Sequence, residues 1–302
     1  MDANHNCMDQ HETDLFKHRT PPNLFDLKKN IQRFESLDLS IISYEDLKMQ
    51  LDEIFPIISF TPVIWDERYH IFRARENNNN SLQKPFNFIS EIGMPKKANS
   101  FGRANIINQP VFYGAHQVDL ALFECCQNLG AMDIKNFTMG VWKVKKNQIL
   151  NLVILNPIEE VINKRKSFEE LANNINNNLK DLKTLDKEYK ELTSEFFSKQ
   201  FAKSTIKQND DYKISAYFSN YVQDLENWSP KKFDGIIYPS VANKFRGENV
   251  TVFKNSLHKI EFTKALSLTC CNYDYENETL TKGIFAEGYQ FGDSIRWKNN
   301  YK

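Results

Sequence analysis

The sequence predicts an α+β protein in which a mixed β-sheet is flanked and interrupted by helices. Two observations indicate this class. Short apolar runs rich in β-branched and aromatic residues alternate with helical segments, and a long, charged helical stretch separates two groups of such runs. The 302 residues are 41% apolar and 26% charged, which is the composition of an ordinary globular protein.

The chain begins with a polar stretch that leads into two expected helices. Residues 1–21 are polar and acidic, and we expect them to be a disordered leader. Residues 22–66 form an expected N-terminal helical region, because apolar residues recur at helical spacing after two prolines. Ser43, followed by Asp46 three residues later, is expected to cap the second of these helices.

Strands are expected in two groups within residues 67–302, which we take as one domain with a β-rich C-terminal extension. In the first group, residues 117–130 are typical of a helix, and the expected strands are "YHIFRAR", "PVFYGA", "FTMGVWKVK" and "ILNLVIL". In the second group the expected strands are "GIIYPS", "NVTVF", "HKIEFTKALSLTCC" and "YQFGDSIRW". The segment between residues 76 and 100 is expected to be a long loop, and loops of that length are usually functional or disordered.

A helical insertion at about residues 157–208 separates the two groups of strands. Its apolar residues fit a heptad register that is interrupted at Asn178. The register is occupied by Phe168, Leu171, Ile175, Leu182, Leu185, Tyr189, Leu192 and Phe196. A coiled coil or helical hairpin would show this pattern, and so would a single apolar stripe along the protein's own sheet, which we favour. In either case the segment is expected to serve packing and not chemistry.

Charge and hydropathy exclude several classes of protein. Lys plus Arg and Asp plus Glu each number 39, so the formal net charge is zero, whereas a broad nucleic-acid footprint needs a basic surplus. No apolar run approaches the roughly 18 residues of a membrane span. The polar, acidic N-terminus is unlike a secretory signal. We therefore expect a cytoplasmic protein that binds neither nucleic acid nor membrane.

Cysteine and histidine spacing predicts neither a disulfide framework nor a metal site. Cys125 and Cys126 are neighbours in an expected helix, and Cys270 and Cys271 are neighbours in an expected strand, so reduced, buried thiols are expected. The N-terminal candidates match no common structural zinc spacing; these are His5, Cys7, His11 and His18.

Residues 101–126 bring together a cation, an aromatic ring and a carboxylate. Arg103, Tyr113 and Glu124 stand ten and eleven residues apart. Arg103 follows a glycine in a loop, Tyr113 closes a strand, and Gly114 is expected to allow a tight turn into the next helix. On a helical wheel Glu124 flanks the expected core stripe, which consists of Val118, Leu122, Cys125 and Leu129. Taken alone, Glu124 is most simply a solvated helix residue and Arg103 an exposed loop residue. Each of the three residues is a weak signal by itself, but their combined order is a stronger one.

This order resembles the RES family, whose domain is named for an arginine, a glutamate and a serine. "YHIFRAR" is similar to the family's opening strand, and "GRAN", "PVFYGA" and "ALFE" are similar to its central block. "YKISAYFSNYVQ", "FDGIIYPSV" and "RGENVTVF" resemble its closing block, with Ser240 at the serine position. The resemblance spans roughly residues 69–254 apart from the insertion. Ala104 stands where the family usually has a tryptophan, and the helix opens at His116 where a serine is more usual.

The resemblance implies an ADP-ribosyltransferase-like mixed β core that binds NAD+ and breaks its nicotinamide–ribose bond. It implies catalytic roles for Glu124, Arg103 and Tyr113. It also implies that the substrate is bound by Arg73, Arg75, Tyr113 and Ser240. NAD+ is then a substrate, so no resident cofactor and no metal is expected.

The residue types suit that chemistry independently. Arginine is the natural bidentate partner of a pyrophosphate, and an aromatic face can stack on the cationic nicotinamide ring. The nicotinamide leaves as a neutral group, so no general acid is needed. One carboxylate, which Glu124 offers, can therefore suffice to stabilise the oxocarbenium-like charge, where ordinary glycosidases need two.

The resemblance also implies a growth-arresting toxin of a toxin–antitoxin pair, in which case a cognate antitoxin protein would be a partner. A homo-oligomer is compatible with the sequence. Two alternatives stay open. One is an ADP-ribosyltransferase that modifies a protein or another macromolecule, and the other is a non-catalytic module that binds NAD or ADP-ribose. The sequence does not distinguish water, phosphate and a macromolecule as the acceptor.

Overall fold

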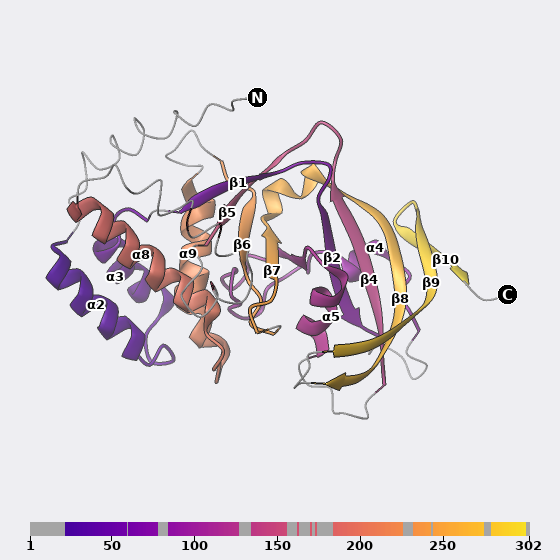
Figure 1. Cartoon of the computed structure of the whole chain (residues 1–302), viewed down its shortest axis with the longest axis horizontal. Coiled ribbons are helices and arrows are strands. Elements are labelled where there is room, and N and C mark those ends of the chain that lie inside the picture. Colours follow the sequence, from indigo (N-terminus) through magenta and orange to yellow (C-terminus); the bar gives the residue numbers. More distant parts are fainter. Residues whose placement is uncertain are drawn as a thin grey trace.

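The computed structural model is an α+β protein built on one ten-stranded sheet with the strand order β1-β5-β6-β7-β3-β2-β4-β8-β9-β10 (Figure 1). It describes residues 22–58, 60–77, 84–126, 134–155, 184–225, 232–242, 244–274 and 279–299, and the single residues 162, 170 and 173. Strands β5 and β6 are parallel, and the other neighbouring pairs are antiparallel. The sheet is therefore mixed, and the predicted fold class is confirmed.

The strands are β1 (Thr61–Trp65), β2 (His70–Glu76), β3 (Phe112–Ala115), β4 (Lys135–Val144), β5 (Leu150–Ile154), β6 (Gly235–Pro239), β7 (Glu248–Val252), β8 (Ile260–Asp274), β9 (Thr279–Phe291) and β10 (Ser294–Asn299). The α-helices are α2 (Leu24–Ser36), α3 (Tyr44–Ile54), α4 (Ile89–Ile92), α5 (Val118–Cys126), α8 (Thr184–Ala202) and α9 (Lys213–Asp224). In the part of the chain that the structure describes, the short 3-10 helices are η1 (Asn209–Tyr212) and η3 (Lys254–Lys259).

Two features of the strands differ from the sequence prediction. Strand β1 was not predicted; it lies at the edge of the sheet, where Pro62 is tolerated because one side of an edge strand needs no ladder donor. The segment "YQFGDSIRW", predicted as one strand, contains the turn between β9 and β10. Gly292 in that turn has a φ of 59°, a conformation that glycine adopts without strain.

Helices α2 and α3 each begin at a side-chain cap. The Asn23 side chain accepts a hydrogen bond from the main-chain N–H of Asp26 at 2.9 Å, so an asparagine and not the preceding proline starts α2. Ser43 accepts from the N–H of Asp46 at 3.1 Å and donates to its carboxylate at 2.6 Å. The predicted cap at Ser43 is confirmed.

Helices α2, α3, α8 and α9 form an aromatic cluster beside the β5–β6 end of the sheet (Figure 1). The rings of Phe55 on the chain after α3 and Phe196 on α8 are stacked with their centroids 5.1 Å apart. Helix α8 contacts α2, α9 and β6, so the described part of the insertion packs on the protein's own core, as favoured. The heptad positions at residues 168–185 lie outside the side chains that the structure describes.

Helix α5 is buried around most of its circumference, so its buried residues are not confined to the one stripe that we predicted. It packs on β2, and its fully buried side chains include Leu120 and Cys126, whereas Cys125 is only partly buried. A helix that is apolar on nearly all sides offers no single stripe for a helical wheel to identify. Cys126 and Cys270 are free, buried thiols, as expected. The predicted stripe residue Leu129 lies outside the described residues.

Gly114 serves close packing and not the tight turn that the sequence suggested. It lies within β3, opposite Val250 of β7. A Cβ at this position would lie 2.4 Å from Cγ2 of Ile71 and 3.0 Å from the main-chain oxygen of Phe72. Only glycine therefore lets β2 and β3 approach this closely, and the chain turns into α5 after Ala115.

No helix in the part of the chain that the structure describes is both long and apolar enough to cross a bilayer. The same residues hold no cluster of three or more histidine, cysteine or acidic side chains that could bind a metal ion. The N-terminal histidines and Cys7, considered above for zinc, lie outside the described residues.

Candidate active site

A cavity of about 630 Å³ lies where β2, β3 and α5 meet the long loop that precedes β3. Pro95 and residues 97–103 of that loop form part of its wall, and Arg103 is the residue among them that we expected in the site. The charged lining residues are three cations, Arg73, Lys97 and Arg103, and one carboxylate, Glu124. Among the described residues the cavity is therefore cationic, and it would attract an anionic ligand.

The loop carries Arg103 in a tight turn that closes on itself. The N–H of Gly102 donates to the carbonyl oxygen of Asn105 at 3.1 Å, and a return bond of 3.4 Å joins the same two residues. A Cβ on Gly102 would lie 2.5 Å from Oδ1 of Asn105 and 2.8 Å from the hydroxyl of Tyr113. The turn therefore requires glycine immediately before the arginine.

Tyr113 fastens this turn to β3. Its hydroxyl donates to Oδ1 of Asn105 at 2.9 Å and accepts from the main-chain N–H of Ala104 at 2.9 Å. Burial raises the pKa of Tyr113 above its ordinary value, so the phenol is neutral. Because the hydroxyl is engaged in the turn, the aromatic ring is what Tyr113 contributes to the cavity wall.

Ala104, which replaces the family's usual aromatic residue, faces the protein core. It is 1% exposed within the N-terminal helical cluster, and its carbonyl oxygen accepts from the hydroxyl of Ser219 at 2.7 Å. Ala104 is not among the described residues that line the cavity. The departure from the family pattern therefore alters the packing beneath the turn.

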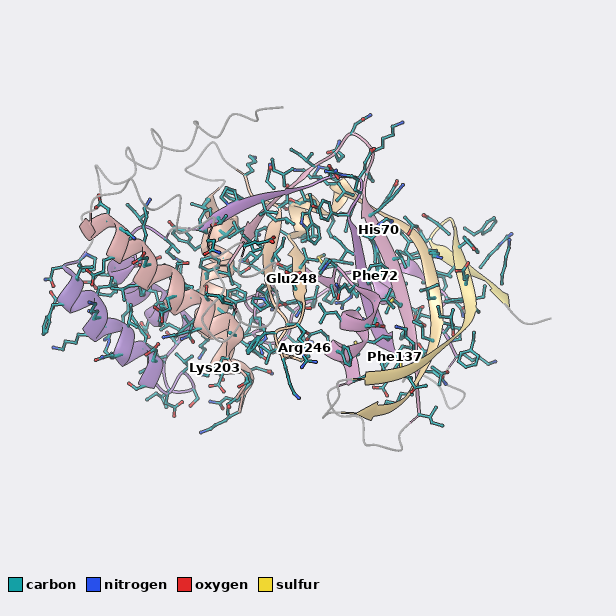
Figure 2. All side chains as sticks on the ribbon, viewed as in Figure 1. His70, Phe72, Phe137, Lys203, Arg246 and Glu248 are labelled. Carbon is teal, nitrogen blue, oxygen red and sulfur yellow. The ribbon has the colours of Figure 1, made fainter. Side chains whose placement is uncertain are left out.

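The guanidinium of Arg103 connects the cavity to the helical insertion. Its Nη1 donates to the carbonyl oxygen of Phe201 at 2.8 Å, and its Nη2 donates to that of Lys203 at 3.0 Å. It also lies 5.2 Å from the ring centroid of Tyr212. Figure 2 shows Lys203 at the lower end of the helical half of the molecule. It shows Phe72, a lining residue of the cavity, on β2 in the other half. The end of the insertion thus supports the site, beyond the packing role that we expected.

Arg73 and Arg75 occupy alternate positions of β2 and differ in their surroundings. Arg73 lines the cavity and donates to the carbonyl oxygens of Gly93 at 3.2 Å and Tyr113 at 2.8 Å. Burial, together with the like charge of Arg75, lowers the pKa of Arg73 to about 10. Arg75 donates to the carbonyl oxygen of Glu91 at 2.8 Å and is not among the described lining residues.

Glu124 brings its carboxylate to the cavity from α5, and two donors hold one of its oxygens. The hydroxyl of Ser240, just after β6, donates to Oε1 at 2.5 Å, and Nδ2 of Asn249, on β7, donates to the same oxygen at 2.6 Å. Ser240 is fully buried and is not among the described lining residues. Ser240, which we expected to bind the substrate, thus contacts Glu124.

Several lining residues were not proposed as site residues from the sequence. These are Tyr212, Tyr238, Asn249 and Cys125. Asn249 had a usable signal, since asparagine is depleted in strands and stands in the predicted strand "NVTVF". Burial raises the pKa of Cys125 to about 11, so this thiol is protonated near neutral pH and is a poor nucleophile.

The fold and the cavity define an α+β protein with a cationic site in which, among the described lining residues, Glu124 is the one carboxylate and is held by two donors. The RES domain model matches residues 70–269, which is more than half of the chain, so the protein belongs to the RES domain family. This membership indicates an activity that involves NAD. A comparison with curated proteins and a comparison with solved structures each found no match.

Proposed function

We propose that the protein cleaves the nicotinamide–ribose bond of NAD+, as a glycohydrolase or phosphorylase, and thereby acts as a growth-arresting toxin. The observation that carries this proposal is the Glu124 carboxylate. It faces a cationic cavity with one oxygen already held by Ser240 and Asn249. A carboxylate held in this way is suited to stabilise positive charge that develops on a bound ligand.

The shape and chemistry of the cavity suit a dinucleotide. Its volume of about 630 Å³ lies within the usual range for small-molecule sites. Arg73, Lys97 and Arg103 supply positive charge for a pyrophosphate, for which a guanidinium fork is the best partner. The rings of Tyr113 and Tyr212 supply aromatic surface for the nicotinamide or the adenine.

In the proposed reaction the bond between the nicotinamide nitrogen and C1′ of the ribose breaks. The bonding electrons pass to the ring nitrogen, which becomes neutral, so no general acid is required. Glu124 holds the ribose and stabilises the positive charge that remains on it. Water or phosphate then forms the new bond to C1′ and loses its proton to solvent.

The toxin role is the second part of the proposal. Unrestrained NAD+ consumption in the cytoplasm would halt growth, so a cognate antitoxin that occludes the cavity would be needed as a partner. Expression of the wild-type protein in a host cell should lower cellular NAD+ and stop growth, whereas Glu124→Gln should do neither. Normal growth and normal NAD+ with the wild type would contradict the toxin role.

Incubation of the purified protein with NAD+ tests the catalytic part directly. Release of nicotinamide with free ADP-ribose supports a glycohydrolase, and release that requires phosphate supports a phosphorylase. Nicotinamide release with label transferred to a protein or another macromolecule would instead indicate an ADP-ribosyltransferase. Binding of NAD+ without cleavage would indicate a binding module. Glu124→Gln is the matched control for contaminating activity.

A further inference from the structure

We infer that Asn249 is a positioning residue for Glu124 and that its side-chain amide, together with Ser240, presents one chosen carboxylate oxygen to the ligand. This inference rests on the proposed function, because it assigns a task within the same site. It starts from two hydrogen bonds to one atom: Nδ2 of Asn249 and the hydroxyl of Ser240 lie 2.6 Å and 2.5 Å from Oε1 of Glu124.

Two donors on a single oxygen determine how the carboxylate is oriented. The terminal torsion of a glutamate is broad, so an unsupported carboxylate rotates freely. Here one donor lies on β7 and the other just after the neighbouring strand β6, since Asn249 pairs with Tyr238 two residues before Ser240. Within the described part of the chain, Oε2 receives no hydrogen bond, so it is the oxygen left for a ribose hydroxyl or for developing charge.

The side-chain oxygen of Asn249 indicates that this residue was not selected for its contribution to the stability of the fold. Its Oδ1 is buried and has no hydrogen-bond partner among the described residues. A buried, unpaired carbonyl oxygen is unfavourable, and an apolar side chain would avoid that cost. Thr251, two residues along the same strand, differs: its hydroxyl donates to the carbonyl oxygen of Ile236 and accepts from its N–H. Asn249 is therefore best explained by the donor that it supplies to Glu124.

A matched control exists on α9. Asn220 also donates its Nδ2 to a carboxylate, that of Asp224 at 2.8 Å, and its Oδ1 is also buried without a partner among the described residues. It is not among the described residues that line the cavity. Asn220→Ala therefore reproduces the loss of an amide–carboxylate hydrogen bond at a position away from the site.

The test measures kcat and KM for nicotinamide release in Asn249→Ala, Asn249→Asp and Asn220→Ala. Loss of a hydrogen bond to a charged group that acts in the transition state lowers a rate by roughly ten- to a hundredfold. In Asn249→Ala, kcat should fall by that factor while KM changes little. The contacts to the ligand remain, but the Glu124 carboxylate is no longer held in one orientation. Asn249→Asp, which keeps the shape but places a carboxylate against Glu124, should lose more. Asn220→Ala should match the wild type.

Wild-type kcat in Asn249→Ala, or an equal loss in Asn220→Ala, would overturn the inference and leave the proposed function intact. The carboxyl NMR resonance of Glu124 in 13C-labelled protein provides a readout that needs no turnover. It should shift in Asn249→Ala and stay in place in Asn220→Ala. If the wild type does not cleave NAD+ but this resonance shifts, the proposed function fails while the positioning of Glu124 stands. An unmoved resonance would overturn the positioning.

Discussion

The guanidinium of Arg103 donates a hydrogen bond of 2.8 Å to the main-chain oxygen of Phe201, 98 residues further along the chain. Phe201 lies in the last turn of α8, where carbonyl oxygens lack helical partners and carry partial negative charge. The cation thus joins the cavity loop to the end of the helical insertion. Arg103 both anchors the loop to α8 and lines the cavity. Substitutions at Arg103 should therefore change both the stability of the protein and its affinity for the ligand.

Arg103→Ala should weaken NAD+ binding and also lower the melting temperature. A charge-assisted contact to a pyrophosphate is worth about 1.5–3 kcal/mol, so the affinity should fall by roughly one to two decades. Arg103→Lys should recover only part of this, because an ammonium cannot reproduce the bidentate fork. Calorimetric titration of NAD+ into Glu124→Gln, with and without Arg103→Ala, measures the affinity without turnover.

Arg68→Ala is the control for removing an arginine, since Arg68 is an exposed residue paired with Asp66 and is not among the described lining residues. It should change neither affinity nor melting temperature. Equal NAD+ affinities with and without Arg103 would remove it from the ligand site. An unchanged melting temperature in Arg103→Ala would show that its contact with α8 contributes nothing to stability.

Glu124→Gln should retain the fold and NAD+ binding but lose at least about two orders of magnitude in turnover, as for removal of one electrostatic stabiliser. The structure explains why the fold should survive. The amide oxygen of glutamine can still accept from Ser240 and Asn249, so neither donor loses its partner. Nicotinamide release and circular dichroism are the two measurements. Full turnover in this variant would rule out a catalytic role for Glu124.

The fold class followed from sequence because the alternation of apolar runs and helical segments is local. The omissions have local causes too. Strand β1 is short, contains Pro62 and is half-buried or exposed at every position before Trp65, so its pattern was weak. The apolar residues of the insertion predicted a packed helix, but periodicity does not say which surface is covered. That α8 packs on α2, α9 and β6 is visible only in the structure.

The residues of the candidate site were predicted from the order of the motifs, and the structure brings most but not all of them into the same cavity. Arg73, Arg103, Tyr113 and Glu124 line one cavity, whereas Arg75 is not among the described lining residues. Asn249 was missed because it meets Glu124 across 125 residues of chain, and spacing along the sequence carries no information about that contact. The pairing of β6 with β7 on one side and of β7 with β3 on the other brings the two together.

Tyr113→Phe should destabilise the protein while leaving most of the NAD+ affinity. The lost hydroxyl leaves the N–H of Ala104 and Oδ1 of Asn105 without their partner, which costs about 1–3 kcal/mol in the free energy of unfolding. The ring, which lines the cavity, is retained. Tyr289→Phe is the control, because its hydroxyl bonds Glu287 on an exposed strand face. Denaturant unfolding that gave the same stability for wild type and Tyr113→Phe would contradict this role.

Gly102→Ala should disrupt the turn that carries Arg103. The new Cβ would lie 2.5 Å from Oδ1 of Asn105, so the asparagine and the Tyr113 hydroxyl would both have to move. We expect a loss of stability and of NAD+ affinity together. Gly283→Ala is the matched control, because a Cβ there lies at an ordinary 3.5 Å from the Phe285 ring. Thermal unfolding and calorimetry measure both effects, and equal behaviour of the two variants would refute the steric argument.

Stability should fall as the pH rises above about 10, because burial raises the pKa of several tyrosines in the folded protein. These are Tyr44, Tyr113, Tyr189, Tyr217 and Tyr238. A raised folded-state pKa means that the native protein holds the phenolic proton where the unfolded chain has released it. The stabilising contribution is therefore complete below the unfolded pKa and is lost as the pH increases through the folded pKa.

Tyr44 allows this prediction to be tested residue by residue. Its hydroxyl is buried without a hydrogen-bond partner among the described residues, so Tyr44→Phe removes an ionisable group at little structural cost. Each buried tyrosine should contribute about 1.4 kcal/mol per pH unit above pH 10 to the decline in the free energy of unfolding. Denaturant unfolding between about pH 8 and about pH 11 should therefore give a shallower decline for Tyr44→Phe by that amount. The same slope in both proteins would show that the Tyr44 phenol ionises as readily in the folded state as in the unfolded chain.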